Sequence, residues 1–558
     1  MKPILLSLFF LCVAFKWESV FSLEDSIISN DVAVEPLCAI QQNTRNLEIL
    51  PFSETQVPII PLPNQFNRAK GIFMINSNTS IIAPDISTGQ TAYFLQKEIL
   101  RYTGIPLSIH ERSTVLAIIL NLNKTGNSEV EGYTLQMKPG TVTITASTEQ
   151  GLFYGVVSLL QLIRKSPVNA STLYLDCWNI QDHPRYSWRG VMLDESRHFF
   201  GIEKVKNFLD WMAFYKLNRF HWHLTDQQGW RFEIKRYPKL TLIGGIGNEG
   251  DSIAPAKYYT QEEIKEIVQY ANERHISVIP EIDMPGHATA ANHAYPEFSG
   301  GGTKEYPDFT FNPGKEATYQ YLTNILSETD ALFPSQMIHI GGDEVHYGSK
   351  AWETDVSVNS MIKAHGLPDL KAIEHYFVRR IGDSLIKLNN KILAWDEIVE
   401  SGTPVNNTIV FWWRQEKPDI LKKALDKGYK VVLCPRLPLY FDFVQDTSHQ
   451  VGRKSTFPNS LDRVYAFSHQ SIPEAEKNEK LILGMQANLW TETVVTERRF
   501  DYLFFPRICA LSEAAWTEGP NKNFKDFEMR ITDDYKLFEK MNVNYFIPGS
   551  GNKNEPLK

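Results

Sequence analysis

Two adjacent carboxyl groups, Asp343 and Glu344, follow an apolar, glycine-ended run at residues 337–342. Two like charges this close raise one of the two pKa values, which suits a general acid at mildly acidic pH. The two glycines leave room for a ligand against the backbone. Further acids and a histidine follow other apolar runs: Asp194, Asp226, Asp283 and His287. This supply of proton donors and acceptors predicts general acid–base catalysis.

Aromatic residues follow the same runs. Trp395, Trp413, Tyr440 and Trp490 each stand where an apolar run ends, and Glu492 comes two residues after the last. Aromatic rings stack on the C–H faces of sugars, while carboxylates and arginine bind hydroxyl groups. The pattern predicts a carbohydrate pocket. Four other tryptophans are instead expected in the core: Trp188, Trp211, Trp222 and Trp516.

These side chains need a scaffold that brings them together. After residue 184, strand-like runs alternate with amphipathic helical runs. Eight strands are predicted, at residues 187–193, 219–224, 277–282, 337–341, 392–396, 408–412, 430–434 and 481–487. Helices are predicted between several of them, at residues 202–216, 261–274, 317–332, 370–388 and 418–427. The pattern predicts an α/β fold with a (β/α)8 TIM barrel as catalytic domain, in which strand ends meet at one face. The fifth connection is too short for a full helix.

A smaller α+β domain is predicted ahead of the barrel. It contains β-rich runs at residues 71–75, 115–121, 133–138 and 141–146, and helical runs at 89–102 and 149–164. The whole chain is divided into a signal peptide (1–22), an irregular lead-in (23–60), the α+β domain (61–184), the barrel (185–548) and a tail (549–558).

Alternation along the strands places polar residues on one face. His221 and His223 share a face of the second strand, as do Glu281 and Asp283 on the third. These faces should point into the barrel, where polar groups must hydrogen-bond one another. Metal-dependent barrel hydrolases also use a His-x-His pair, but on their first strand. A hydrogen-bonded structural pair is therefore favoured, and no metal is expected.

Five ordered segments resemble the family 20 glycoside hydrolases, the β-N-acetylhexosaminidases. They are Trp-Arg-Gly-Val-Met-Leu-Asp-Glu-Ser-Arg-His (188–198), His-Trp-His-Leu-Thr-Asp (221–226), Pro-Glu-Ile-Asp-Met-Pro-Gly-His (280–287), His-Ile-Gly-Gly-Asp-Glu (339–344) and Asn-Leu-Trp-Thr-Glu (488–492). The resemblance covers both domains. It implies exo-hydrolysis of terminal β-linked N-acetylglucosamine or N-acetylgalactosamine with retention, and neither a protein nucleophile nor a cofactor.

The resemblance also implies a role for each site residue. Glu344 would protonate the glycosidic oxygen and later activate water, while Asp343 would orient the substrate's acetamide N–H. Tyr440 would bind the acetamide carbonyl oxygen, inside a wall of Trp395, Trp413 and Trp490, with Trp413 preferred to Trp412. Arg197 would hold O3 and O4, Glu492 would bind O4, and Asp442 would lie toward O6. The supporting residues would be Asp194, Asp226, Asp283 and His287.

Composition limits the partners. The chain has 558 residues, of which 43% are hydrophobic and 22% charged, and its net charge is -8. An acidic protein of this kind is a poor match for nucleic acid, so the expected partner is a glycan. Two other functions stay open: an N-acetylhexosamine-binding protein without turnover, and a metal-dependent barrel hydrolase. The natural glycan and the oligomeric state also stay open, with a homodimer among the options.

The first 22 residues have the features of a secretory signal. Lys2 precedes an apolar run at residues 4–15, and cleavage is expected after Ser22. The run is short for a membrane span of about 20 residues. The sequence thus predicts the secretory pathway, with an extracellular, periplasmic or lysosomal destination. Glycosylation candidates are Asn78, Asn123, Asn169 and Asn406. The cysteines left after cleavage (Cys38, Cys177, Cys434 and Cys509) are expected as buried free thiols or in one or two disulfides.

Overall fold

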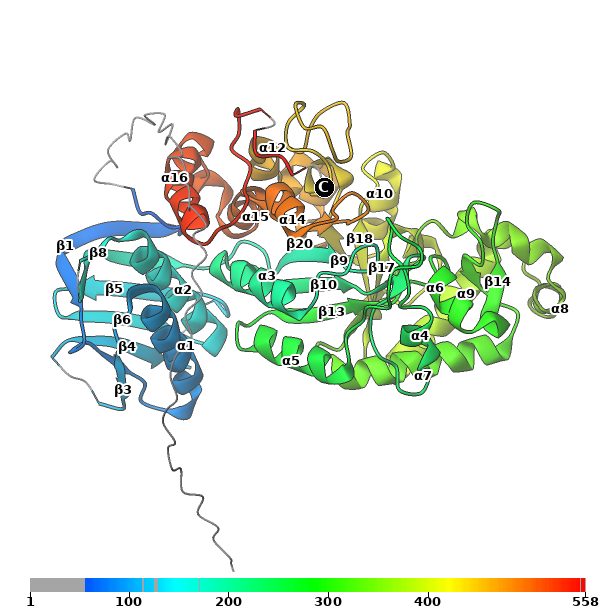
Figure 1. The fold of residues 1–558 in the computed structure, drawn as a ribbon, viewed down its shortest axis with the longest axis horizontal. Coiled ribbons are helices and arrows are strands. Elements are labelled where there is room, and N and C mark those ends of the chain that lie inside the picture. Colours follow the sequence, from blue (N-terminus) through cyan, green and yellow to red (C-terminus); the bar gives the residue numbers. More distant parts are fainter. Residues whose placement is uncertain (1–55, 113–114, 125–128, 170, 552, 557–558) are drawn as a thin grey trace, which may run out of the picture. The chain divides into compact units, whose positions relative to one another are not determined.

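The computed structural model describes residues 56–112, 115–124, 129–169, 171–551 and 553–556. The predicted signal peptide, most of the lead-in and Cys38 lie outside these residues. The described chain contains a mixed sheet with two helices, followed by a closed barrel (Figure 1).

The first domain is a mixed β-sheet whose strands lie in the order β1-β8-β5-β6-β4-β2-β3, with β7 paired to β8. Its strands are β1 (Gln65–Ile75), β2 (Ser80–Ile82), β3 (Ser108–His110), β4 (Ala117–Leu122), β5 (Tyr133–Lys138), β6 (Thr141–Ala146), β7 (Val168–Asn169) and β8 (Thr172–Asp182). Helices α1 (Ile86–Thr103) and α2 (Glu149–Lys165) pack together and cover one face of the sheet (Figure 1). Helix α1 begins with a capping box between Asp85 and Thr88 and ends at the left-handed Gly104.

The second domain is a closed barrel of eight parallel strands in the order β10-β13-β16-β17-β18-β19-β20-β9. These are β9 (Trp188–Asp194), β10 (Arg219–His223), β13 (Ser277–Glu281), β16 (Met337–His339), β17 (Lys391–Trp395), β18 (Thr408–Trp412), β19 (Lys430–Leu433) and β20 (Ile482–Leu489). Two short hairpins project from the connections: β11 (Thr225–Asp226) with β12 (Gly229–Trp230), and β14 (Ser299–Gly301) with β15 (Thr310–Phe311).

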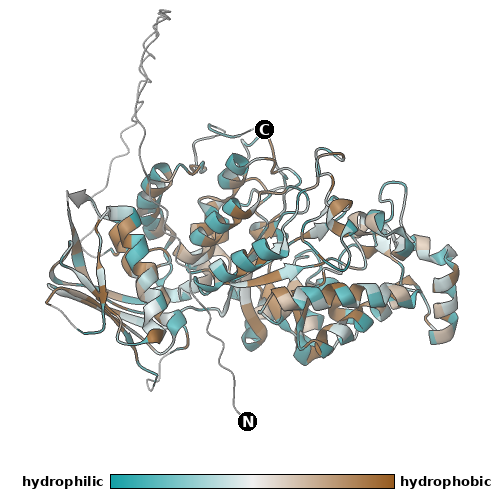
Figure 2. Ribbon diagram, turned by 60° about the horizontal axis from the view of Figure 1, so that its bottom comes forward, coloured by the Kyte–Doolittle hydropathy of each residue, from teal (hydrophilic) through white to brown (hydrophobic). Residues whose placement is uncertain are grey.

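Helices form the connections outside the barrel. The longer ones are α3 (Ile202–Phe214), α5 (Gln261–Asn272), α7 (Glu316–Leu332), α8 (Val356–His365), α9 (Leu370–Lys387), α10 (Pro418–Asp426), α14 (Glu497–Phe504), α15 (Arg507–Trp516) and α16 (Phe524–Lys540). The shorter ones are α4 (Lys239–Leu242), α6 (Thr289–Ala294), α11 (Arg436–Leu439), α12 (Leu461–Ala466) and α13 (Pro473–Lys477). In Figure 2 many of these helices carry teal and brown stripes, as amphipathic helices do. No described helix combines the length and the apolar composition needed to cross a lipid bilayer.

The predicted fold class, a TIM barrel after a smaller α+β domain, is confirmed. Each of the eight predicted barrel strands overlaps an observed strand, and the fifth connection holds only short 3-10 turns, such as Asp396–Glu400. Strand β8 was not predicted, because exposed Asp176 and partly exposed Asn179 interrupt its apolar run. The first half of β1 was not predicted either, because it is polar and exposed.

Buried polar contacts join the two domains. Asp182, at the end of β8, accepts hydrogen bonds from Tyr133 of its own domain and from Lys216 and Trp516 of the barrel domain, at 2.8 to 3.1 Å. Gln161 of α2 donates a hydrogen bond to the carbonyl oxygen of Phe214 at 2.8 Å. Each of these buried side chains therefore has a hydrogen-bond partner, as buried polar groups require.

The described cysteines are free thiols. Cys177, Cys434 and Cys509 are all buried, and no disulfide joins them to one another. For these three, the free-thiol alternative is therefore the one found, while Cys38 lies outside the described residues.

Candidate active site

Asp343 and Glu344 lie directly after β16, on backbone that turns sharply. Gly341, Gly342 and Glu344 all have positive φ, at 62°, 89° and 53°. Glycine adopts this region without penalty, but Glu344 has a Cβ and pays about 1 kcal/mol or more for it. Strain of this kind concentrates at functional sites, where the surrounding structure fixes the side chain. The turn places both carboxyl groups toward His287.

Gly341 is required by its neighbour Asp283. A Cβ on Gly341 would lie 1.9 Å from Asp283 Oδ1, whereas a Cβ on Gly342 would meet nothing within 4 Å. The backbone N–H of Gly342 donates a hydrogen bond to the same Asp283 oxygen at 3.2 Å. Asp283, predicted as a supporting residue, therefore packs directly under the turn that carries Asp343 and Glu344.

This difference predicts unequal effects of two neighbouring substitutions. Gly342→Ala should cost about 1–2 kcal/mol, because alanine is strained at positive φ. Gly341→Ala should cost about 1–3 kcal/mol more, because its methyl group must also displace Asp283. Urea unfolding of the two variants measures the difference. Equal losses of unfolding free energy would show that Asp283 moves aside freely.

His287 connects the carboxyl pair to a buried aspartate. Its Nδ1 lies 2.9 Å from Asp226 Oδ1, and its Nε2 lies 3.7 Å from Asp343 Oδ2 and 3.6 Å from Glu344 Oε2. Burial opposes the charged imidazole, but Asp226, Asp283 and Asp343 together hold the pKa of His287 well above its usual value. The same ring, with Arg197, holds the pKa of Asp226 well below its usual value despite burial. His287 is therefore a buried cation beside the carboxyl pair.

The carboxyl pair differs from the prediction in one respect. Burial raises the pKa of Asp343 to about 6, with the charge of Glu344 adding to the effect. Burial also acts on Glu344, but His287 and Arg197 outweigh it and lower the pKa of Glu344. Crowding was expected to raise the pKa of the general acid; in the unliganded site it raises that of Asp343. The reason is that the Glu344 side chain is 34% exposed, whereas Asp343 is more deeply enclosed.

Asp194 and Arg197 form the next part of the site, after β9. Asp194 Oδ1 accepts hydrogen bonds from the backbone of Ser196 and Arg197, and its Oδ2 accepts two from Thr491. Arg197 Nη2 lies 2.8 Å from Asp226 Oδ2, and the guanidinium lies 5.0 Å from the centre of the Trp490 ring. Arg197 Nε has no hydrogen-bond partner among the described residues, so this buried donor is available to a ligand.

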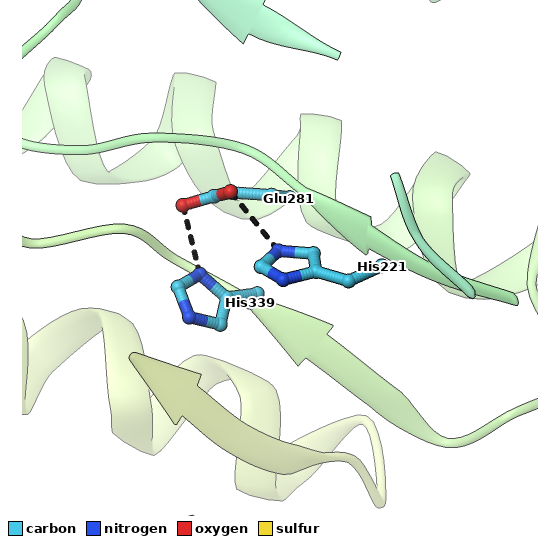
Figure 3. A group of neighbouring side chains, drawn as sticks. All are labelled: His221, Glu281 and His339. Atoms are coloured by element: carbon cyan, nitrogen blue, oxygen red, sulfur yellow. Dashed lines mark ion pairs between the residues drawn. The ribbon is translucent and has the colours of Figure 1, made fainter. Parts of the chain in front are cut away.

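The barrel interior holds a hydrogen-bonded polar cluster, as predicted. Glu281 Oε2 lies 2.6 Å from His223 Nδ1 and 3.0 Å from His221 Nε2, while Oε1 lies 2.9 Å from His339 Nδ1. Trp395 also donates a hydrogen bond to Oε1 at 2.9 Å. Figure 3 shows His221 and His339 both pointing at the Glu281 carboxylate. Glu281 is therefore the centre of this cluster.

The side chains around Glu281 are joined by hydrogen bonds and ion pairs in this structure. The nitrogen and oxygen atoms of His221, Glu281 and His339 lie close enough together to hold a metal ion. In this structure His221 Nε2 lies 3.0 Å from Glu281 Oε2 and His339 Nδ1 lies 2.9 Å from Glu281 Oε1, both within hydrogen-bond distance. The other two candidate groups both include His287. In this structure the Nδ1 atom of that ring is already paired with Asp226.

The predicted aromatic wall is assembled in the structure. Trp413 and Tyr440 are nearly parallel, with ring centres 6.4 Å apart, and Trp490 lies 6.2 Å from Tyr440 and 5.9 Å from Trp395. Trp412 packs instead in the main hydrophobic core. Burial raises the pKa of Tyr440 well above its usual value, so its hydroxyl keeps its proton and can donate it to a ligand. The four tryptophans expected in the core (Trp188, Trp211, Trp222 and Trp516) are all buried.

Asp442 and Glu492 meet through a residue that the sequence did not reveal. Arg453 Nε lies 3.1 Å from Asp442 Oδ2, and Arg453 Nη2 donates a hydrogen bond to Glu492 Oε1 at 2.6 Å. Arg453 belongs to an irregular connection for which no role was predicted. No sequence signal marks it, because its contacts with both carboxylates are tertiary.

Three further charged residues of the site were also missed. Arg414 forms ion pairs with Asp396 and with Glu397, the latter at 2.9 Å, and Trp413 Nε1 donates to Glu397 at 3.2 Å. These residues fix the orientation of the Trp413 ring. A signal was present, because Asp396 and Glu397 directly follow Trp395 and Arg414 directly follows Trp413.

The assembled site combines two kinds of chemistry. One side offers a carboxyl pair beside a buried cation, which can give and take a proton at one position. The other side offers aromatic rings, a protonated phenol and an arginine with a free donor, which can hold a small polyhydroxylated ring.

Comparisons with known proteins show similarity to one enzyme family. The catalytic-domain model of glycosyl hydrolase family 20 matches residues 186–519, and the model of domain 2 of that family matches residues 56–183. A β-hexosaminidase of Porphyromonas gingivalis is 33% identical over 528 residues, which cover 92% of this chain and 67% of that protein. A β-hexosaminidase of Vibrio furnissii is 32% identical over 505 residues, which cover 87% of this chain and 80% of that protein.

A solved structure has the same fold over most of the chain. It is the exo-β-N-acetylglucosaminidase of Vibrio harveyi in complex with N-acetylglucosamine, with a TM-score of 0.81 and 30% sequence identity. The similarity covers 90% of this chain and 80% of that chain.

Proposed function

The chain belongs to glycosyl hydrolase family 20, and we infer that it is an exo-acting β-N-acetylhexosaminidase. It releases terminal β-linked N-acetylglucosamine or N-acetylgalactosamine from oligosaccharides or glycoconjugates. The observation that carries this conclusion is the pairing of Asp343 and Glu344 around His287, beside a wall of Trp395, Trp413, Tyr440 and Trp490.

In the proposed first step, the substrate supplies the nucleophile. The Asp343 carboxylate accepts a hydrogen bond from the acetamide N–H, which makes the carbonyl oxygen more nucleophilic, and Tyr440 donates a hydrogen bond to that oxygen. The carbonyl oxygen bonds to C1 while the bond from C1 to the leaving oxygen breaks. Glu344 gives its proton to the leaving oxygen. The product of this step is an oxazolinium ion.

In the second step, water opens that ring. Glu344, now a carboxylate, takes a proton from the water as it bonds to C1, and the acetamide is restored. Two inversions at C1 give overall retention. Glu344 must begin protonated, although its pKa is lowered in the free site. A bound sugar would cover its exposed part, and loss of water raises the pKa of a carboxyl group.

The remaining site residues hold the sugar ring in this proposal. Arg197 binds O3 and O4, Glu492 binds O4, and Asp442 binds O6, while the aromatic wall encloses the ring and its acetamide. Arg197 and both carboxylates carry buried polar atoms with no hydrogen-bond partner among the described residues, as a preformed polar pocket requires. Asp194, Asp226, Asp283 and His287 hold the reacting groups in place.

A cavity of about 310 Å³ borders Glu344 and offers space for the leaving group. Its lining carries charges of both signs: Lys371, Arg414, Lys417, Glu374, Asp396, Glu397 and Glu400. Because Glu344 must face the glycosidic oxygen, the group beyond that oxygen extends into this polar cavity. We propose that charged side chains recognise the leaving group there, while the identity of the natural glycan stays open.

Chromogenic substrates test the proposed function. We expect 4-nitrophenyl β-N-acetylglucosaminide or its galacto epimer to be hydrolysed, whereas the β-glucoside, which lacks the acetamide, should not be. A matching experiment with a chelator should leave the rate unchanged. No turnover by the wild type would favour a sugar-binding protein, and loss of activity with chelator would favour the metal-dependent hydrolase.

We also propose that the protein enters the secretory pathway and is glycosylated. The apolar run at residues 4–15 supports the first proposal. Asn78, Asn123 and Asn406 are exposed, as a glycosylation site requires, and this supports the second. Asn169 lies where side chains are not described. N-terminal sequencing and glycosidase treatment of protein from the native host would test both proposals.

A further inference from the structure

Arg453 lies at the rim of the sugar pocket and is not used by the proposed mechanism. Its guanidinium contacts both Asp442, which is 1% exposed, and Glu492. The contact with Glu492 is a hydrogen bond of 2.6 Å, whereas the contact with Asp442 has the geometry of an ion pair at 3.1 Å. One cation therefore bridges the two carboxylates proposed to bind O6 and O4.

The two carboxylates keep free oxygens for a ligand. Asp442 Oδ1 and Glu492 Oε2 are buried and have no hydrogen-bond partner in the part of the chain that the structure describes, whereas Asp442 Oδ2 has the ion pair with Arg453. The negative charges of Asp442 and Glu492 repel each other, and burial strengthens this repulsion. Burial raises the pKa of Asp442 to about 7, an effect that Arg453 opposes and Glu492 increases. The positive charge of Arg453 thus offsets the repulsion between the Asp442 and Glu492 carboxylates.

The backbone of Arg453 is held against the residue that its side chain contacts. Its N–H donates to the Asp442 carbonyl oxygen at 3.2 Å, and its own carbonyl oxygen accepts from Val444 at 2.9 Å. Glu555, from the last described segment, accepts hydrogen bonds from the backbone N–H groups of Gln450 and Val451. The Arg453 side chain is 43% exposed, but these hydrogen bonds fix the backbone from which it extends.

We propose that Arg453 is a positioning and specificity-determining residue, which holds Asp442 and Glu492 against the O4–O6 edge of the terminal sugar. The proposal rests on the proposed function. Its consequence is that replacing Arg453 should lower kcat/KM more for a substrate that carries the hydroxyl groups bound by Asp442 and Glu492 than for one that lacks them. A residue that only shaped the loop would affect all substrates alike.

The test compares variants on two substrates. Arg453→Met should lower kcat/KM for 4-nitrophenyl β-N-acetylglucosaminide by about 10- to 100-fold, mainly through KM, because charge-assisted hydrogen bonds to the sugar are weakened. With the 6-deoxy analogue, which gives Asp442 no hydroxyl group, the loss should be at least about threefold smaller. Arg453→Lys should recover part of the activity, since lysine keeps the charge but cannot bridge both carboxylates. The neighbouring exposed Lys454→Met is the matched control and should behave as the wild type.

The pH dependence gives a second readout. Without Arg453 the pKa of Asp442 rises further, so the ionised fraction of Asp442 falls by a larger factor at pH 6 than at pH 9. The loss in Arg453→Met should therefore be larger at the lower pH. Equal losses on both substrates, or no loss on either, would overturn the proposal.

A binding measurement separates this proposal from the proposed function. The same variants are titrated with free N-acetylglucosamine and its 6-deoxy analogue by calorimetry, which requires no turnover. An inactive wild type would contradict the hydrolase function. The affinity ratios would still decide the role of Arg453, because Arg453→Met should weaken the parent sugar more than the 6-deoxy sugar.

Discussion

Glu344→Gln is expected to lower kcat by roughly 10²- to 10⁴-fold, the range that a positioned general acid–base group contributes. Glutamine fills the same space but can neither give a proton to the leaving oxygen nor take one from water. The loss should be larger for substrates with alkyl or sugar leaving groups than for 4-nitrophenyl substrates, because nitrophenolate leaves without a proton. Steady-state kinetics with both substrate types measures this difference.

Azide separates the two roles of Glu344. An anionic nucleophile needs no general base, so azide should restore the second step and form a β-glycosyl azide. It should not restore the first step for a poor leaving group. The control is Glu353→Gln, an exposed glutamate in the same connection, which should behave as the wild type. A Glu344→Gln enzyme with near wild-type kcat would contradict the assignment.

Asp343→Asn is expected to lower kcat by roughly 10²-fold or more, because asparagine lacks the charge that polarises the acetamide N–H. The wild-type kcat/KM should also fall as the pH drops through about 6, where Asp343 becomes protonated and loses its charge. The variant should lose the part of this acid limb that comes from Asp343, while the part that comes from Asp442 should remain. A pH series of kcat/KM for the two proteins measures both effects, and unaltered turnover would refute the acetamide role.

Stability provides the control for Asp343→Asn. The pKa of Asp343 is raised in the folded protein to about 6, so its contribution to stability is present at low pH and is lost as the pH rises through that value. The neutral asparagine avoids the cost of an ionised buried carboxylate. The variant should therefore be at least as stable as the wild type at pH 7.5. A much lower unfolding temperature would mean that the loss of activity reflects misfolding.

The barrel could be predicted from the sequence because its strands are short, buried and separated in several places by amphipathic helical runs. Polar residues at every second position also predicted the inward-facing cluster around Glu281, which the structure contains. Strand β8 could not be predicted in the same way, since its exposed face carries polar residues such as Asp176. Its place is determined by pairing with β1 and β5, which are distant in the sequence.

The site was predictable where its residues follow strand ends, and not where they come from long connections. Asp343, Glu344 and Trp395 directly follow apolar runs, and the closed barrel brings such positions together. Arg453 lies eleven positions after Asp442, in a connection without periodicity, and only the folded loop returns it to Asp442. The lowered pKa of Glu344 was likewise not predictable, because it depends on how close His287 and Arg197 lie.

The central claim is that the acetamide group of the substrate is the nucleophile. The most direct measurement is kcat/KM for 4-nitrophenyl glycosides whose N-acetyl group carries zero, one, two or three fluorine atoms. Each fluorine withdraws electrons from the carbonyl oxygen but changes the size of the group little. If this oxygen attacks C1, kcat/KM should fall steeply with each added fluorine. Values that stay constant across the series would contradict substrate-assisted catalysis by this enzyme.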